Sequence, residues 1–473
     1  MSRFSRFCLA ALVLLHCQFA AAQAGAAASV QAAQADAALA AAIDARLAPF
    51  FRDDKPGVTV IVTRDGKPLF RKAYGLADVA RRVPMEPGMS LRLGSITKQF
   101  TAVSILMLAE EGKLAIGDDI RKYLPDYPSR GKTITIEHLL THTAGIVNYT
   151  SRPGFGRNDK HDMSVTQVID SFKNDPLEFE PGTRFAYTNS GYFLLGAIIE
   201  KVSGMPYAQF VAQRIFVPLG MTQTAYEGHE RAPAVRAAGH TRGFFGVTAS
   251  DGPSMTVPYA AGALVSCVDD LARWDAALYA GTLLKSATLQ KAFTSYTLAD
   301  GKPTRYGYGW YLTKLQGHAA ISHSGAITGF TSYALRLPDD KVYAAVLQNS
   351  DASPIEPEMV ANIAASYAIG APLLPYTPIA LDAKTLDAYA GVYRINATAT
   401  RTFKREGDHL LMVRANGDTK PIYAYSENGF YIDKTWVHFE FARDAQGVVD
   451  RLTLVEKGVE VDWPRIGDVP AKP

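Results

Sequence analysis

A serine and a lysine three positions apart are the first residues in this chain that could do chemistry together. Ser95 and Lys98 form an S-x-x-K pattern where the loop 91–94 meets a stretch of helical periodicity. Side chains three apart on a helix face the same way, so the Lys98 amine can reach the Ser95 hydroxyl. Serine is a weak nucleophile without a base, and a lysine can act as the base when burial lowers its pKa. The pattern indicates a nucleophilic serine.

The spacing alone is not specific. Ser129 and Lys132 form a second S-x-x-K in a Pro-Ser-Arg-Gly loop that has no reason to be catalytic. A helix N-cap would also explain Ser95, because a serine oxygen commonly accepts the first free N–H groups of a helix. Catalysis therefore needs support from other segments.

Two further motifs provide that support. Tyr187 and Asn189 form the only Y-x-N in the chain, where a phenol can relay a proton and an amide can orient a substrate. His323, Ser324 and Gly325 end a predicted strand, where a glycine lets the backbone pass close to a ligand. Taken singly, the first motif also fits a loop tyrosine beside a capping asparagine, and the second fits a turn at a strand edge.

The elements that must position these residues form an α+β pattern. β-branched and alternating runs predict strands, and apolar residues recurring every three to four positions predict helices. We therefore predict one antiparallel sheet built from both ends of residues 36–370, flanked by helices, with a helical lobe inserted between. The predicted helices cover 39–50, 97–111, 192–202, 268–279 and 356–368, and the predicted strands cover 57–63, 67–74, 319–322, 330–337 and 341–348.

The chain beyond residue 370 has a different texture. Prolines mark a linker over 371–380, and short alternating strands split by Asn-Gly and Gln-Gly turns follow between 389 and 466. This pattern predicts a small all-β barrel or sandwich, and we assign a C-terminal β-barrel domain to 381–473.

The N-terminus has the features of a secretory signal. Arginines precede a short apolar run, and small residues follow up to an A-x-A-like end at Ala24. We predict a cleaved signal peptide over 1–24 and a periplasmic or secreted protein without stable membrane insertion. A lipoprotein acylated at Cys17 is a minor alternative, because the bulky His16 precedes that cysteine.

Composition and absent motifs narrow the function further. Apolar residues make up 48% of the 473 and charged residues 20%, which are globular values. A formal charge of +3 without a basic run argues against a nucleic-acid partner. The sequence has no H-E-x-x-H, C-x-x-C, complete phosphate loop or G-x-S-x-G, so we expect no metal, no cofactor and no α/β-hydrolase elbow. The scattered histidines, His142 among them, lack ligand spacing and are expected to be structural.

The three motifs, in their order along the chain, resemble those of class C β-lactamases and the related penicillin-binding esterases and D-aminopeptidases. The resemblance covers residues 40–370 and implies a serine hydrolase domain of β-lactamase/transpeptidase-like fold over 36–370. The segment 381–473 is similar, more loosely, to a lipocalin-like domain appended to some members. Supporting stretches are His142-Thr143-Ala144-Gly145, Pro218-Leu219-Gly220-Met221 and Tyr308-Gly309-Trp310.

The resemblance also implies roles for single residues. Ser95 would attack a carbonyl and form an acyl-enzyme, Lys98 and Tyr187 would share the role of base, and water would release the product. The backbone N–H groups of Ser95 and Ala326 would form the oxyanion hole. The residues implied in substrate binding are Asn189, His323, Ser324 and Gly325.

One departure from the family pattern concerns the substrate. Such β-lactamases carry lysine at the first position of the third motif, as K-T-G, whereas this chain has His323, a residue type mostly neutral at pH 7. The change favours an ester, an amide or a D-amino-acid peptide over efficient β-lactam hydrolysis, with peptidoglycan as a candidate partner. A penicillin- or peptidoglycan-binding sensor that acylates and stalls is the alternative.

Overall fold

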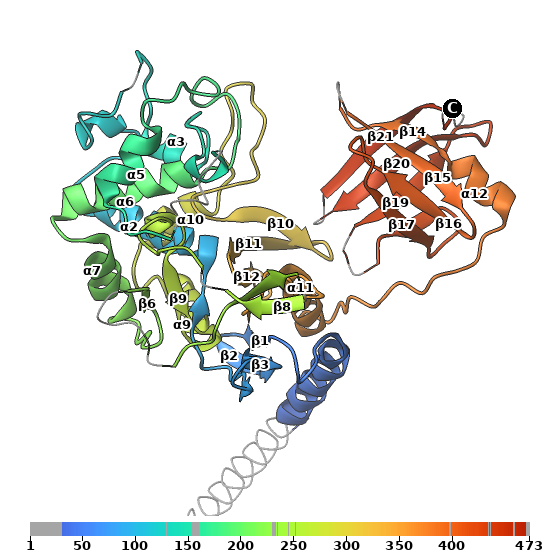
Figure 1. The fold of residues 1–473 in the computed structure, drawn as a ribbon, viewed down its shortest axis with the longest axis horizontal. Coiled ribbons are helices and arrows are strands. Elements are labelled where there is room, and N and C mark those ends of the chain that lie inside the picture. The colour runs from blue at the N-terminus through green and yellow to red at the C-terminus, as the bar shows by residue number, and fades with distance from the viewer. Residues whose placement is uncertain are drawn as a thin grey trace, which may run out of the picture.

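The computed structural model describes residues 31–469, apart from 129, 153–159, 229–232, 234, 245, 251, 397–398, 434, 436 and 457–458. It shows a larger body and a β-barrel joined by an extended segment (Figure 1). The predicted signal peptide with Cys17, and Ser129 of the second S-x-x-K, lie outside the described residues. None of the helices in the described part combines the length and the apolar character that a membrane crossing requires.

A six-stranded antiparallel sheet forms the centre of the larger body, in the order β10-β11-β12-β13-β1-β2. Asp65 and Gly66 turn β1 into β2 with φ angles of 49° and 72°, which suits a two-residue hairpin. The predicted sheet built from both ends is confirmed, although β10 is not among the strands that the sequence predicts. The strands are β1 (Val58–Arg64), β2 (Lys67–Tyr74), β10 (Tyr311–Leu315), β11 (His318–Ile327), β12 (Phe330–Leu337) and β13 (Val342–Gln348).

Helices cover both faces of this sheet. Alternation along β1 sends Val60 to one face, where it packs with the helix over 31–47 and with α11 (Pro357–Ala368). Ile61 points to the opposite face and joins the core of the helical lobe. The lobe helices are α2 (Thr97–Glu110), α3 (Ile136–Leu140), α5 (Val165–Phe172), α6 (Asn189–Ser203), α7 (Tyr207–Val211), α8 (Tyr259–Gly262), α9 (Val268–Ala280) and α10 (Ser286–Ala292).

The helix α2 lies inside the lobe rather than on its surface. Every residue from Thr97 to Leu108 is buried, and neighbouring helices, α6 and α8 among them, surround it. The sequence predicts this helix with a single apolar face, whereas the structure encloses all of it. A helix packed on all sides cannot slide or rotate without opening voids, so its first turn has a fixed position.

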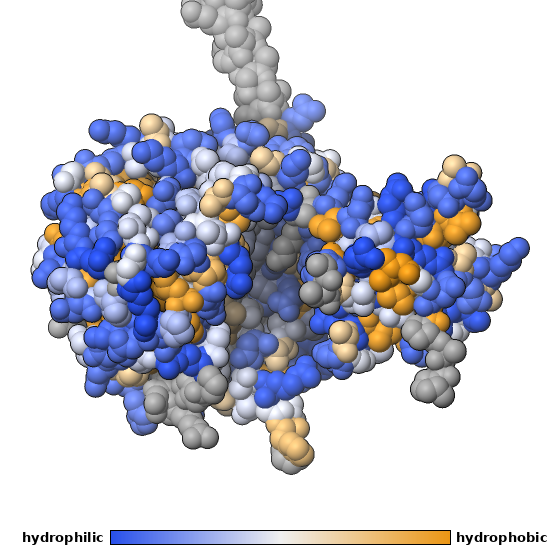
Figure 2. All heavy atoms as spheres, turned by 90° about the horizontal axis from the view of Figure 1, so that it is seen from above, coloured by the Kyte–Doolittle hydropathy of each residue, from blue (hydrophilic) through white to orange (hydrophobic). Residues whose placement is uncertain are grey.

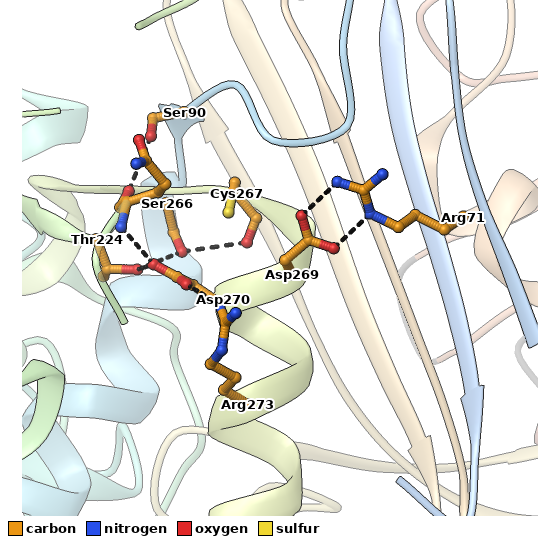
Figure 3. Close-up of polar contacts among 9 residues, drawn as sticks. Arg71, Ser90, Thr224, Ser266, Cys267, Asp269, Asp270 and Arg273 are labelled. Carbon is orange, nitrogen blue, oxygen red and sulfur yellow. Dashed lines mark hydrogen bonds and ion pairs between the residues drawn. The ribbon is translucent and has the colours of Figure 1, made fainter. Parts of the chain in front are cut away.

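A small sheet and a polar network hold the chain that leads into α2. Asp270, at the start of α9, accepts hydrogen bonds from Thr224 Oγ1 at 2.8 Å and from Arg273 at 2.6 Å (Figure 3). Beside it, Arg71 of β2 donates to both carboxylate oxygens of Asp269, at 2.6 and 2.7 Å. These bonds tie the small sheet β5-β9-β6 to the central sheet. The short strands are β3 (Leu76–Asp78), β4 (Val83–Pro84), β5 (Leu91–Arg92), β6 (Ala225–Tyr226), β7 (His240–Gly243), β8 (Gly246–Ala249) and β9 (Leu264–Ser266).

The C-terminal segment closes into an eight-stranded barrel, β14 to β21, which decides between the predicted barrel and sandwich. Aromatic side chains that include Tyr389, Phe403, Phe430 and Phe441 pack together in the hydrophobic core of this domain. The short helix α12 (Ala383–Tyr389) precedes the barrel. Its strands are β14 (Gly391–Arg394), β15 (Thr400–Glu406), β16 (His409–Val413), β17 (Thr419–Ala424), β18 (Gly429–Tyr431), β19 (His438–Arg443), β20 (Val449–Glu456) and β21 (Val459–Gly467).

Candidate active site

Ser95 lies on a tight turn at the entrance to α2. A 3₁₀ turn over Gly94–Ile96 runs directly into the α-helix at Thr97. Gly94 has φ of 53°, and a Cβ atom at this position would lie 2.8 Å from the backbone nitrogen of Ala326. A glycine is therefore needed for the turn to touch β11. This contact brings the backbone N–H of Ala326 beside the turn that holds Ser95.

Lys98 is the second residue of α2, one turn after Ser95, and its side chain is 0% exposed. Its Nζ lies 3.0 Å from Ser95 Oγ, 2.8 Å from Asn189 Oδ1 and 2.9 Å from the carbonyl oxygen of Ala261. Burial lowers the pKa of Lys98 well below the ordinary value of a lysine. The neutral amine is thereby favoured.

The three contacts suit a neutral amine that faces a serine. The carbonyl oxygen of Ala261 and the amide oxygen of Asn189 can only accept hydrogen bonds. A neutral amine has two N–H groups and one lone pair, so both N–H groups are used by these oxygens. The lone pair is left for Ser95, whose hydroxyl can donate as well as accept. The arrangement can take up the serine proton.

Tyr187 lies on the other side of the serine. Its ring centroid is 4.9 Å from the Lys98 Nζ. Burial raises the pKa of Tyr187 above the ordinary value of a phenol, although the nearby Ser95 side chain opposes this shift. Burial thus shifts the phenol toward its protonated form and the amine toward its neutral form. Opposite pKa shifts of this kind separate a proton donor from a base.

Asn189 is the first residue of α6 and completes the set. Thr188 caps the helix by accepting from the backbone N–H of Ser190. The Asn189 amide group donates from Nδ2 to Thr150 Oγ1 at 3.0 Å, and its backbone N–H donates to Asn148 Oδ1 at 3.1 Å. These bonds fix which atom of the amide faces Lys98. The loop over 148–150 therefore orients the amide.

The third motif has a buried residue, His323, and an exposed one, Ser324. The imidazole of His323 is 1% exposed, with Nδ1 2.6 Å from its neighbour's carbonyl oxygen and Nε2 3.0 Å from the Tyr306 hydroxyl. Burial, and secondarily the charge of Lys98, lowers the pKa of His323 to about 3. The ring is neutral and packs against Tyr187. It does not line the pocket, so the predicted contact between this side chain and a substrate is not found in the structure. Ser324 is exposed, and Gly325 packs against the carbonyl of Leu93.

These residues open onto a pocket of about 240 Å³. Ser95, Asn189 and Ala326 line it together with Tyr149 and Thr150. Ser95, the Lys98 partner Asn189 and Ala326 of β11 thus line the same space. Within the described part of the chain, no three His, Cys, Asp or Glu side chains gather as metal ligands would.

Comparisons with known proteins identify the family of the chain. A family model described as beta-lactamase matches residues 36–368, and a second model, a domain of unknown function (DUF3471), matches residues 377–463. The chain belongs to the beta-lactamase family. Penicillin-binding protein 4* of Bacillus subtilis is 29% identical over 432 residues, covering 86% of this chain and 94% of the relative.

Solved structures show the same beta-lactamase-family fold. The octameric penicillin-binding protein homologue from Pyrococcus abyssi has a TM-score of 0.66 and 26% identity, and covers 89% of this chain and 99% of its own. The D-amino acid amidase from Ochrobactrum anthropi has a TM-score of 0.59 and 25% identity, over 71% of this chain and 97% of its own. A D-stereospecific amidohydrolase from Streptomyces has a TM-score of 0.57 and 28% identity, over 71% and 97%.

Some residues of this beta-lactamase-family site escape sequence reasoning. Asn148 and Thr150 orient Asn189, but a short polar loop carries no signal of its own. His142 is one of the histidines that the sequence predicts to be structural. It is fully buried, and its ring centroid lies 4.2 Å from that of Tyr187. Its Nδ1 accepts from the Thr188 backbone N–H at 3.2 Å. The sequence signal for a position of His142 near the site is the stretch His142-Thr143-Ala144-Gly145, which is one of the segments that resemble the family.

Proposed function

We propose that the chain is an exported serine hydrolase that forms an acyl-enzyme at Ser95 and releases the product with water. The observation that carries the proposal is the set of contacts around the Lys98 amine. Two obligate acceptors occupy its N–H groups, and the third contact is the Ser95 hydroxyl at 3.0 Å. A buried amine with its lone pair aimed at a serine is a base in place.

The chemical steps follow from these positions. The Ser95 oxygen bonds to the substrate carbonyl carbon while its proton passes to the Lys98 nitrogen. The oxyanion receives the N–H groups of Ser95 and Ala326, an arrangement typically worth about 3–4 kcal/mol in transition-state stabilisation. The bond to the leaving group then breaks, and the leaving group takes a proton from Tyr187, which Lys98 reprotonates. Water repeats the sequence on the acyl-enzyme and restores the serine.

The proposed substrate is a small amide, ester or D-amino-acid peptide. The neutral, buried His323 leaves the third motif without the permanent cation that a lysine would supply for a β-lactam carboxylate. The relatives named D-amino acid amidase and D-stereospecific amidohydrolase are consistent with amide chemistry. A second candidate is a penicillin-binding protein that acylates without turnover, which the relative named Penicillin-binding protein 4* brings into consideration.

One experiment tests the nucleophile and separates these candidates. Wild type is incubated with a fluorophosphonate and with penicillin, and intact mass reports the adduct; p-nitrophenyl esters, D-aminoacyl p-nitroanilides and a chromogenic cephalosporin report turnover. We expect labelling and steady turnover of an ester or anilide, both lost in Ser95→Ala. Ser129→Ala, in the second S-x-x-K, is the control and should behave as wild type. Full labelling of Ser95→Ala would refute this nucleophile, and a single burst without a steady rate would favour the stalled protein.

Export is part of the same proposal. Cleavage after Ala24 would deliver the protein to the periplasm or the medium, without stable membrane insertion. Intact mass of the protein recovered from its native compartment tests this. We expect a mature chain that begins at Gly25; a full-length chain in the cytosol, or an acylated N-terminal Cys17, would contradict it.

A further inference from the structure

A second cavity, of about 590 Å³, lies between the barrel mouth and the end of the central sheet. Figure 2 shows the molecule hollowed between its larger body and its barrel. On the sheet side, Ser324, Gly325 and Ala326 of β11 line the cavity. Ala326 also lines the 240 Å³ pocket of Ser95. The two spaces therefore share Ala326, the residue whose backbone N–H is proposed to bind the oxyanion.

Three basic side chains form part of the barrel wall of this cavity: Arg401, Arg414 and Lys420. Each stands two positions from a core residue on its own chain segment, namely Phe403, Met412 and Ile422. Because side chains two apart on a strand share a face, Arg401 and Lys420 face the inside of the barrel, and Arg414 lines the same cavity. Arg401 is on β15, Lys420 is on β17 and Arg414 directly follows β16, and these three strands are neighbours in the barrel. We call these three residues the cationic rim.

In the described part of the chain, no carboxylate forms an ion pair with the cationic rim. Extending the register that pairs Thr402 with Val413 places Arg401 directly opposite Arg414. Like charges facing each other across strands are destabilising. Among the described residues, no carboxylate lies within ion-pair distance of the three side chains, and their charged groups make a single hydrogen bond, from Arg401 to the Thr400 carbonyl oxygen. An arrangement that costs stability and leaves its charges open is suited to a ligand anion.

The cavity floor below the rim is apolar. Met412, Ile432, Phe439, Leu454 and Trp463 line it from inside the barrel. A ligand that fits would therefore carry an anionic group at the rim and a hydrophobic group that reaches the floor.

The acidic residues of the cavity limit the ligand's charge. Glu456 is on β20, across the barrel from the cationic rim, and Glu356 and Glu358 stand at the start of α11 on the sheet side. Carboxylates on the facing walls disfavour a polyanion such as a phosphorylated ligand or a nucleic acid. They are compatible with a single carboxylate whose other end is neutral or positively charged. This is the charge pattern of a short peptide.

We propose that the barrel is a substrate-recognition domain whose cationic rim holds the free carboxylate of a short peptide with an apolar C-terminal residue, while its scissile carbonyl lies at Ser95. The identification of the peptide as a substrate rests on the proposed function. The rim thus supplies the permanent cation that His323 does not. Arg401, Arg414 and Lys420 determine specificity and take no part in the bond-breaking steps.

Equilibrium binding to the full-length Ser95→Ala chain tests the rim independently of catalysis. Isothermal titration compares two dipeptides, acetyl-D-Ala-D-Phe as the free acid and as its C-terminal amide. We expect the acid to bind roughly tenfold tighter or more, since a bond to a charged group is typically worth that much. The preference should fall to about one when Arg401→Gln, Arg414→Gln and Lys420→Gln are combined.

Matched variants keep the result interpretable. Arg451→Gln removes an exposed arginine on β20 that lies outside the cavity lining, and the acid preference should persist. Arg414→Lys keeps the charge and should retain most of the preference, while a thermal melt checks that the barrel still folds. Equal binding of acid and amide in the Ser95→Ala chain, or an unchanged preference in the triple variant, would overturn the proposal. Wild-type hydrolysis of p-nitrophenyl acetate reports on the proposed function by itself, so a failure of either idea is visible separately.

Discussion

Lys98 in the catalytic pocket and Lys420 on the barrel rim have the same side chain in opposite surroundings. The first is 0% exposed, and its nitrogen meets three oxygen atoms, two of them obligate acceptors and the third the Ser95 hydroxyl. The second is exposed at the mouth of a cavity. Burial disfavours the charged form of an amine, whereas water stabilises it. In the proposed mechanism the larger body therefore uses a buried lysine as a base, whereas the barrel presents an exposed lysine to a ligand.

The difference shows what each part of the molecule must provide. A base needs fixed geometry, because proton transfer depends on distances close to 3 Å. The enclosed helix α2 and the network beside β9 meet that need. A recognition cation needs an open charge and a nearby apolar surface more than it needs rigid placement. The barrel rim meets that need with long side chains above a hydrophobic floor.

Replacing each lysine by arginine is the sharpest test of this contrast and has the largest expected effect. Arginine keeps a positive charge but is not deprotonated in proteins. Lys98→Arg and Lys98→Met should both lose on the order of 10⁴-fold in kcat with a p-nitrophenyl ester. Lys420→Arg should keep the acid preference in dipeptide binding, because charge alone is required there. Substantial activity in Lys98→Arg would mean that position 98 acts as a cation, and the contrast would fail.

The phenol side of the pocket is tested by Tyr187→Phe. The raised pKa of Tyr187 assigns it to proton donation, so its loss should depend on the leaving group. With an amide, whose amine must be protonated, kcat should fall roughly 10²–10⁴-fold. A p-nitrophenyl ester should suffer far less, because p-nitrophenolate leaves without a proton. Equal losses for both substrates would instead assign Tyr187 to the attack step.

The backbone contact between the serine turn and β11 is tested by Gly94→Ala. Its added methyl would lie 2.8 Å from the Ala326 nitrogen, so the oxyanion donors should separate and kcat should drop about 10²–10³-fold. Gly112→Ala is a matched control. Gly112 has a φ of 70°, so alanine there is also strained by the left-handed backbone, but its Cβ would have no atom within 4 Å. The control should lose stability by circular dichroism melts while keeping its kcat. A similar fall in both variants would trace the effect to strain.

The sequence predicts the individual helices and strands of this fold, but it does not predict which of them become enclosed by the rest of the protein. Hydrophobic period and Asp-Gly or Gly signals indicate β1, β2, α6 and α9 because these elements are coded by neighbours in the chain. The pairing of Ser95 with Lys98 follows from helix geometry for the same reason. That α2 is buried on every side, or that His323 turns inward toward Tyr306, depends on residues far away in sequence. The cavity at the barrel mouth depends on how the sheet and the barrel sit together, which no local pattern encodes.

The smallest predicted effect concerns stability, and it separates His323 from the open cations of the barrel. Its folded pKa of about 3 lies below the ordinary value of 6.5, so the unfolded chain binds more protons between these pH values. Stability attributable to this group is therefore present above pH 6.5 and is lost as the pH falls toward 3. Between pH 7 and pH 5 the loss should be about 2 kcal/mol in the free energy of unfolding of the larger body. Urea unfolding of wild type and His323→Gln, followed by tryptophan fluorescence at both pH values, measures it. The variant should show a correspondingly smaller pH dependence, whereas equal pH dependence in both proteins would mean that His323 is not held neutral by its burial.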